Sequence, residues 1–205
     1  MQLLLNKASA LPTLLERYDD MMDLEGLSDI VAVERLRNDY RKILESFREW
    51  ELMLQSEVPS PVFWSKRNLS NASSSHADVL WFPNIMTANS LNHCWAFEII
   101  AKNYLSRLDE AVFTARRDTH QASLRTLSLP TSEKPVATLA NMICDSMAYL
   151  LQPDMKLYGP ASACFTLPTA LMVFQSDPGY YSSQLGRCQQ ILDRFADMGF
   201  YFPRI

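Results

Sequence analysis

Between residues 33 and 54 the chain carries an apolar stripe in which steps of three and four residues alternate. Its seven members are Val33, Leu36, Tyr40, Ile43, Phe47, Trp50 and Leu54. Such spacing places all of them on one face of an α-helix, and charged residues such as Arg41 and Glu45 occupy the other faces. The stripe packs either on the core of its own chain, which is the commoner case, or on a partner helix. In the second alternative the chain forms a homodimer through this helix.

Apolar periodicity predicts five further helices, joined by turns that contain proline, and the 205 residues include only five glycines. These helices are expected over residues 12–25, 83–108, 131–152, 159–174 and 178–198. Two polar stretches separate them: a mobile loop at 65–78 and a variable connection at 114–131. The expected fold is therefore all-α, a single-domain helical bundle of about six helices over residues 1–205.

Individual residues mark where the C-terminal helices begin and end. Thr131 or Ser132 is expected to cap the helix that Pro153 terminates, and Asp177 to cap the last helix, which ends before Gly199. Pro168 falls inside the helix over 159–174, where it removes one backbone donor and is expected to produce a kink.

The charge balance and hydropathy limit the classes of partner. Lys and Arg number 19 against 23 Asp and Glu, so the net charge is -4, which argues against direct binding of nucleic acid. Lys7 follows the N-terminal apolar run rather than preceding it, unlike a secretory signal, and no run of about eighteen apolar residues predicts a membrane span. We therefore expect a soluble, cytoplasmic protein, or a nuclear one if it regulates transcription.

No metal site or cofactor is expected. The four cysteines, Cys94, Cys144, Cys164 and Cys188, are dispersed without a C-x-x-C pair, and His76, His93 and His120 do not supply zinc-finger spacing. Reduced, mostly buried thiols are the preferred interpretation. The chain also lacks the hydrolase, zinc-peptidase and nucleotide-binding motifs G-x-S-x-G, H-E-x-x-H, G-x-x-x-x-G-K-[ST] and G-x-G-x-x-G.

Polar residues inside the apolar helices are the remaining candidates for chemistry. Asn89 and His93 share one face of the helix over 83–108, and Cys94, Glu98 and Lys102 share the adjacent face. We expect an ion pair between Glu98 and Lys102 and a hydrogen-bonded His93.

Asn141, Asp145 and Tyr149 are spaced by four on the helix over 131–152. A buried carboxylate needs a partner, so Asp145 is either exposed or specifically satisfied. If it points inward beside Tyr149, it provides a directional anchor in an apolar cavity.

The last third of the chain resembles the end of the fungal-specific transcription factor domain, the helical regulatory region of binuclear zinc-cluster regulators. The segments that carry the resemblance are ICDSMAYLLQPDMKLYGPASACFTLPTALMVFQ at 143–175 and CQQILDRFADMGFYFPRI at 188–205. Matching residues are Ile143, Cys144, Ser146, Tyr149, Met155, Gly159, Pro160, Ala161, Ser162, Ala163, Phe165, Cys188, Leu192, Gly199 and Phe202. The segments FREWE at 47–51 and ANSLNHCWAFEII at 88–100 are also similar to the family's amphipathic and central helices.

The sequence departs from the family in its cysteines. The family's finger holds two zinc ions with six closely spaced cysteines, whereas this chain has four dispersed ones. Asp145 also stands where the family commonly has a basic residue, Ala148 where it has an acidic one, and Pro168 near a usual Arg. The resemblance therefore implies a helical regulatory domain without its DNA-binding finger.

Two functional hypotheses follow. The first is a regulator-derived protein of fungal secondary metabolism, and thus of natural product biosynthesis. It would bind an apolar small molecule and act as a cofactor-free cyclase or isomerase, such as a Diels–Alderase. Its catalytic residues would be His93, Asp145 and Tyr149, and its substrate pocket would be shaped by Trp95, Phe97, Phe165 and Asn89. The second hypothesis is a transcriptional regulator or interaction module that dimerises with or restrains DNA-binding relatives.

Overall fold

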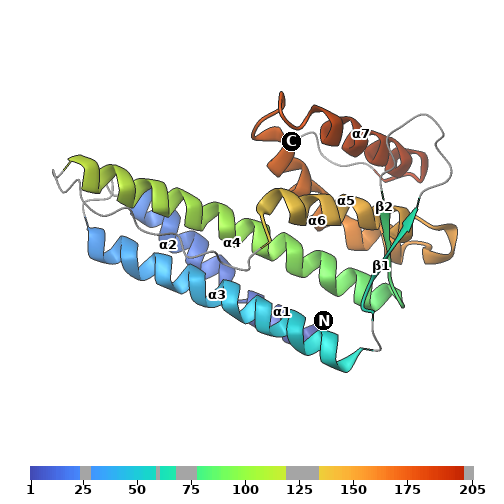
Figure 1. Ribbon diagram of the computed structural model, residues 1–205, viewed down its shortest axis with the longest axis horizontal. Helices are drawn as coiled ribbons and strands as arrows, with labels where there is room; N and C mark the ends of the chain where they lie inside the picture. Colours follow the sequence, from blue (N-terminus) through green and yellow to red (C-terminus); the bar gives the residue numbers. More distant parts are fainter. Residues whose placement is uncertain (24–28, 59–60, 68–77, 119–133, 201–205) are drawn as a thin grey trace.

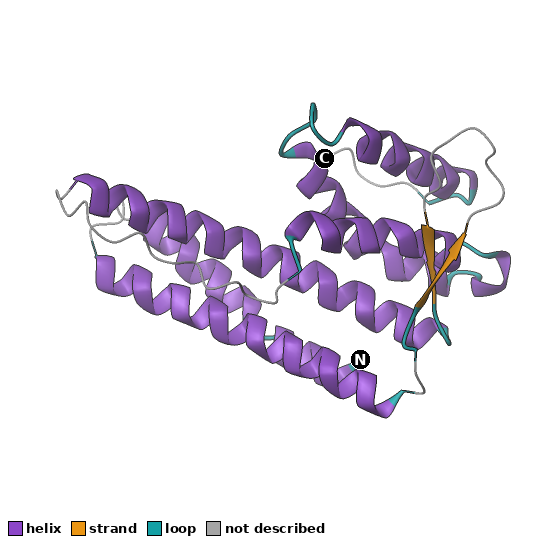
Figure 2. Cartoon of the chain, viewed as in Figure 1, coloured by secondary structure: helices purple, strands orange, loops and turns teal. Residues whose placement is uncertain are grey.

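The computed structural model describes residues 1–23, 29–58, 61–67, 78–118 and 134–200. In this part of the chain the helices are α1 (Gln2–Ala8), α2 (Leu11–Asp23), α3 (Ile30–Glu57), α4 (Ile85–Asp118), α5 (Val136–Leu150), α6 (Tyr158–Gln175) and α7 (Ser182–Asp197). A 3-10 turn, η1 (Pro153–Met155), precedes α6, and strands β1 (Trp64–Arg67) and β2 (Asp78–Trp81) form a small antiparallel pair. The expected all-α bundle is confirmed (Figure 2).

The two longest helices, α3 and α4, run side by side along the long axis of the molecule (Figure 1). Helices α1 and α2 pack on α3, while α5 and α6 pack on α4 and on each other. Helix α7 lies on α6 and α5, and strand β2 lies on α5. As a result, α4 is shared by the N-terminal and C-terminal groups of helices.

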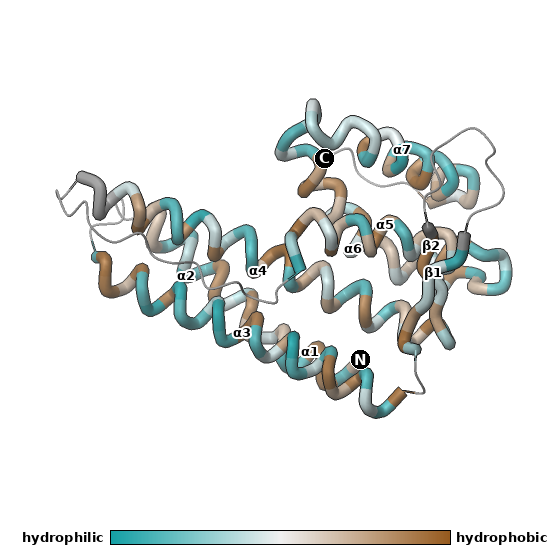
Figure 3. Tube along the Cα trace, in the orientation of Figure 1, coloured by the Kyte–Doolittle hydropathy of each residue, from teal (hydrophilic) through white to brown (hydrophobic). Residues whose placement is uncertain are grey.

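The stripe on α3 points into the core of its own chain. Asp29 caps the helix, because its carboxylate accepts hydrogen bonds from the backbone N–H groups of Val31 and Ala32 at 3.0 and 3.1 Å. Six of the seven stripe residues are buried: Val33, Leu36, Tyr40, Ile43, Phe47 and Trp50. Apolar and polar residues alternate along α3 accordingly (Figure 3). The stripe therefore packs on the core of its own chain, the commoner of the two alternatives, and pairing with a second copy through these buried residues is not supported.

Three boundaries in the N-terminal half differ from the expectations. Helix α1 was not expected: it has only seven residues, too few for a periodic pattern, and buries only Leu4 and Ala8. Helix α4 continues to Asp118, so the start of the expected connection at 114–131 is helical. The ends of the expected loop at 65–78 belong to β1 and β2, which pair Trp64 with Trp81, whereas residues 68–77 lie outside the described chain.

The C-terminal helices follow the expected order. Pro135 precedes the first residue of α5, whereas the expected caps Thr131 and Ser132 lie outside the described residues. Pro168 lies inside α6 as expected. The carboxylate of Asp177 accepts a hydrogen bond from the N–H of Tyr180 at 3.0 Å, but only a turn forms there and α7 begins at Ser182. Gly199, at a φ of 84°, follows the end of α7.

Candidate functional site

Helix α6 has no charged residue anywhere in its sequence, YGPASACFTLPTALMVFQ. One side of it is buried against α4 and α5 through residues that include Ala163, Leu167, Ala170 and Phe174. The opposite side is open, and we call it the α6 face: Leu157, Tyr158, Ala161, Cys164, Phe165 and Met172. A helix that is apolar all round is normally enclosed by other elements, but one side of this helix is uncovered in the described structure.

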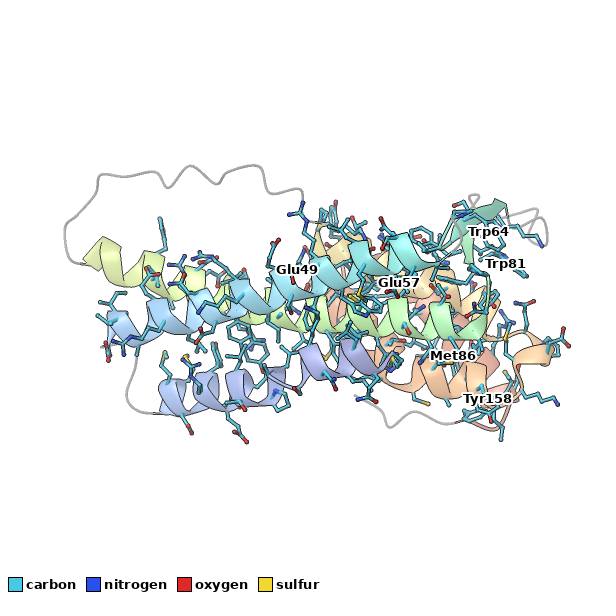
Figure 4. The ribbon with its side chains drawn as sticks, turned by 90° about the horizontal axis from the view of Figure 1, so that it is seen from below. Glu49, Glu57, Trp64, Trp81, Met86 and Tyr158 are labelled. Carbon is cyan, nitrogen blue, oxygen red and sulfur yellow. The ribbon has the colours of Figure 1, made fainter. Side chains whose placement is uncertain are left out.

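Three exposed residues with large apolar side chains on the α6 face follow a seven-residue spacing. Tyr158, Phe165 and Met172 are 77%, 39% and 49% exposed and share one side of the helix because seven residues complete nearly two turns. Met86, at the start of α4, is 61% exposed. Figure 4 shows Met86 and Tyr158 at the same end of the molecule, where α4 and α6 both begin. Exposed apolar side chains thus occur along α6 and at the start of α4.

Four residues predicted for the pocket or for catalysis meet at the boundary between α4 and this face. The His93 ring stacks on Phe165 with centroids 5.7 Å apart, and Phe97 lies 5.5 Å from Phe165. The Nδ1 atom of His93 is 2.8 Å from the backbone carbonyl of Asn89. Asn89, His93 and Phe97 are half-buried, so the group forms the edge of the α6 face rather than an enclosed cavity.

The hydrogen bond to Asn89 fixes the tautomer of His93. A carbonyl oxygen only accepts, so Nδ1 must donate, and in the neutral ring Nε2 then carries the lone pair. Burial lowers the pKa of His93 below its ordinary value of 6.5, although the bond to Asn89 opposes this change. At neutral pH the imidazole is uncharged and presents a weak base beside an apolar surface.

Trp95 and Tyr149 belong to a second aromatic cluster, beneath the two strands. Trp95 is fully buried, and its ring centroid lies 6.4 Å from that of Phe82. The ring centroid of Phe82 in turn lies 5.3 Å from that of Tyr149. Tyr149 also makes an edge-to-face contact with Trp81 of β2 at 5.6 Å. Burial raises the pKa of the Tyr149 phenol above its usual 10.0, so this hydroxyl stays protonated. These rings fill the space between α4, α5 and β2 as packed core.

Asp145 is satisfied by a partner from another helix. Its carboxylate forms an ion pair with Arg187 of α7, with both side chains partly buried. Asp145 was expected to be either exposed or paired with a specific partner, and the structure shows the second alternative. The ion pair therefore links α5 to α7.

A partly open pocket of about 210 Å³ lies elsewhere, between α3, α4 and the segment before α5. Its lining is largely charged and consists of Leu44, Glu45, Arg48, Glu51, Leu52, Gln55, Glu98, Lys102 and Lys134. The Lys134 ammonium lies 2.6 Å from a carboxylate oxygen of Glu51. The Lys102 ammonium lies 3.7 Å from a carboxylate oxygen of Glu98. It also donates a hydrogen bond of 2.8 Å to the backbone carbonyl of Lys134. The expected pair of Glu98 and Lys102 is confirmed.

This charged pocket balances two buried carboxylates against two ammonium groups. Burial raises the pKa of Glu98, and the nearby Lys102 opposes that rise. The Cys94 thiol, 3.9 Å from Glu98, has a pKa well above its usual 9.0 because it is buried next to a carboxylate, so it is a poor nucleophile. Because the charges neutralise one another, we interpret the network as the attachment of α5 to α3 and α4. Sequence spacing reveals only the pair within α4, since Glu51 and Lys134 are 83 residues apart.

Comparison with protein-family models, curated proteins and solved structures finds no match to this chain. Among the described residues, no group of three or more His, Cys, Asp or Glu side chains is placed to hold a metal ion. None of the described helices combines the length and apolar character needed to cross a membrane.

Proposed function

We propose that this chain is a protein-interaction module that binds an apolar helix of a partner protein through the α6 face. The observation that supports the proposal most directly is the absence of charge along α6 together with the exposure of Tyr158, Phe165 and Met172. Large exposed apolar patches mark protein contacts, and burial of one such side chain is worth about 1.5–3 kcal/mol. A partner helix laid along the seven-residue spacing would cover all three side chains.

The resemblance to the fungal-specific transcription factor domain suggests what the partner is. Regulators of that family are DNA-binding proteins with helical regulatory regions, so the proposed partner is a helix from such a regulator. The module itself would not contact DNA, since its net charge of -4 opposes phosphate binding. It would dimerise with or restrain the regulator, and we then expect it in the nucleus.

The experiment measures binding of the purified chain to purified helical domains of binuclear zinc-cluster regulators by isothermal titration calorimetry. Phe165→Glu places a carboxylate at the centre of the α6 face, and we expect it to weaken binding at least tenfold, about 1.4 kcal/mol. The matched control is Phe113→Glu, which changes a residue that is 69% exposed near the other end of α4. Circular dichroism establishes that both variants keep their helices.

Equal loss of binding in the two variants, or none in either, would contradict the proposal. Light scattering of the chain alone adds a separate outcome. A dimer that Phe165→Glu dissociates and Phe113→Glu leaves intact would assign the α6 face to a second copy instead of a regulator.

A second candidate function rests on the convergence of Asn89, His93, Phe97 and Phe165 at the edge of the face. The uncharged imidazole of His93 lies next to the Phe97 and Phe165 rings and the backbone carbonyl of Asn89. Such a combination of apolar groups and a few polar atoms suits an apolar small molecule. We propose, as the alternative, that such a molecule binds there and is cyclised or isomerised without a cofactor, with His93 Nε2 as the base that accepts a proton or hydrogen bond from it. Trp95, Asp145 and Tyr149 have no part in this version.

Incubation with linear polyketide or terpenoid precursors tests this alternative. Conversion faster than in buffer, and lost in His93→Phe, would support it. A rate equal to that in buffer for every precursor would exclude catalysis, and the interaction proposal would be unaffected.

A further inference from the structure

Two buried cysteines from different helices face each other across the contact between α5 and α7. The Sγ atoms of Cys144 and Cys188 are 3.5 Å apart, although the residues are separated by 44 positions in the sequence. Cys144 is 2% exposed and Cys188 is fully buried. The ion pair between Asp145 and Arg187 lies directly beside them and joins the same two helices. Thiol pair and ion pair together hold α7 in register on α5.

We propose that Cys144 and Cys188 form a reversible redox pair, in which a hydroperoxide converts the two thiols into a disulfide that ties α7 to α5. A disulfide needs its sulfurs at about 2.05 Å, so the two sulfur atoms must approach each other by about 1.5 Å. The inference does not depend on which function the α6 face serves.

The two sulfurs are suited to different roles. A hydrogen bond from Cys144 and the charge of Arg187 lower the pKa of Cys188, in spite of its burial. The same contact and burial raise the pKa of Cys144 well above its usual value. Arg187 directly precedes Cys188 on α7, so we place the attack on the oxidant at Cys188 and the resolving step at Cys144.

The chemistry balances as two steps. The Cys188 thiolate attacks one oxygen of the hydroperoxide, the O–O bond breaks, and the other oxygen leaves as alcohol or water after taking up a proton. The Cys144 sulfur then attacks the sulfenic acid on Cys188. The S–S bond forms and the sulfenic oxygen leaves as water with the Cys144 proton. Overall, two thiols and one hydroperoxide give one disulfide, one water and one alcohol, or two waters when the oxidant is hydrogen peroxide.

Burial limits when the two thiols can react with an oxidant, but it does not prevent the reaction. Neither sulfur is open to solvent, so the oxidant must reach Cys188 during a local opening of α7. Cys164 is exposed on the α6 face and provides an internal comparison, because it has no neighbouring thiol among the described residues. Oxidation of Cys164 would give an intermolecular bond or a higher oxide rather than an internal link.

The test uses the full chain, reduced with dithiothreitol, desalted and treated with hydrogen peroxide. Free thiols are then alkylated in denaturant, and a digest without reductant is mapped by mass spectrometry. We expect a peptide pair joined between residues 144 and 188, loss of the free thiols at these two positions, and recovery of both with dithiothreitol. The variant Cys164→Ser should give the same link, whereas Cys188→Ser should abolish it.

Hydrogen exchange of α7 supplies a readout that is independent of the variants. Amides of α7 should exchange more slowly in the oxidised than in the reduced chain. Full alkylation of Cys144 and Cys188 after peroxide treatment that has oxidised Cys164 would overturn the proposal. Equal exchange of α7 in a linked and an unlinked sample would overturn the claim that the bond ties this helix down. If Cys188→Ser does not fold, the link map and the exchange data on the unaltered chain still decide the question.

Discussion

His93 of α4 and Phe165 of α6 stack with ring planes 25° apart, and this contact joins the core to the exposed side of α6. The histidine is half-buried and bonded to the backbone, whereas the phenylalanine keeps 39% of its surface open. The stack leaves one flank of Phe165 free for a partner. It also makes the protonation of His93 a factor in stability, because a charged imidazole at this place would lose hydration.

We predict that His93→Phe flattens the dependence of stability on pH in mild acid. Burial lowers the pKa of His93 below 6.5, so between the folded and unfolded pKa values the unfolded chain binds more protons. The contribution of His93 is present above pH 6.5 and is lost as the pH falls through the lower, folded pKa. Urea unfolding at a series of pH values measures the slope. An unchanged slope in His93→Phe would show that other groups cause it.

The interior position of the α3 stripe predicts a large difference between two residues of the same helix. Phe47 is fully buried, with its ring centroid 6.0 Å from that of Phe97, whereas Leu52 is 57% exposed. Phe47→Ala should lower the free energy of unfolding by about 3–5 kcal/mol, and Leu52→Ala by less than about 0.5 kcal/mol. Urea denaturation gives both values. Similar costs at the two positions would mean that the stripe is not in the core.

Gly159 and Gly186 should respond in opposite directions to the same change. A Cβ atom on Gly159 would lie 1.8 Å from the carbonyl oxygen of Leu150, whereas one on Gly186 meets nothing within 4 Å. Gly159→Ala therefore forces apart the backbones of α5 and α6 and should lower the melting temperature sharply. Gly186→Ala should raise stability by about 0.5–1 kcal/mol through helix propensity. A melting temperature unchanged by Gly159→Ala would rule out this close approach.

Lys102 should be far more important to stability than an exposed lysine in a similar pair. The side chains of Lys102 and Glu98 are both 11% exposed, whereas Lys42, paired with Asp39, is 78% exposed. Lys102→Met leaves a buried carboxylate without its nearest ammonium and should cost about 3 kcal/mol at neutral pH. Lys42→Met should cost less than about 1 kcal/mol.

Acid should reduce the cost of Lys102→Met. The pKa of Glu98 is already raised by burial, so its carboxyl binds a proton more readily in the folded than in the unfolded chain. Below the unfolded pKa, Glu98 is neutral in both states and no longer needs Lys102. Thermal unfolding at pH 7 and at about pH 4 compares the two conditions. A cost that is the same at both values would contradict this role for the pair.

Local patterns in the sequence are enough to predict most of the fold. The stripe from Val33 to Trp50 needs only helical periodicity, and the pair of Glu98 and Lys102 needs only i,i+4 spacing. Elements too short to show a period were missed: α1 and the two four-residue strands are stabilised by contacts with helices, not by a pattern of their own.

The candidate site is harder to predict because it depends on distant partners. Nothing near Asp145 in the sequence indicates Arg187, which lies 42 residues away, and nothing near Glu51 indicates Lys134. The apolar composition of α6 predicts burial on every side, so the sequence places Phe165 in an interior pocket. Only the packing of α6 on α4 and α5 determines which half is covered, and that packing leaves Phe165 at the surface.

Helix α4 is 34 residues long. It contacts α3, which belongs to the N-terminal group of helices, and it also contacts α5 and α6, which belong to the C-terminal group. If either group of helices separated from the rest of the molecule, one side of α4 would lose its packing contacts. Because the two groups share this helix within the described residues, we expect heating to unfold them together. Calorimetry should record one melting peak, with a van't Hoff enthalpy equal to the calorimetric one.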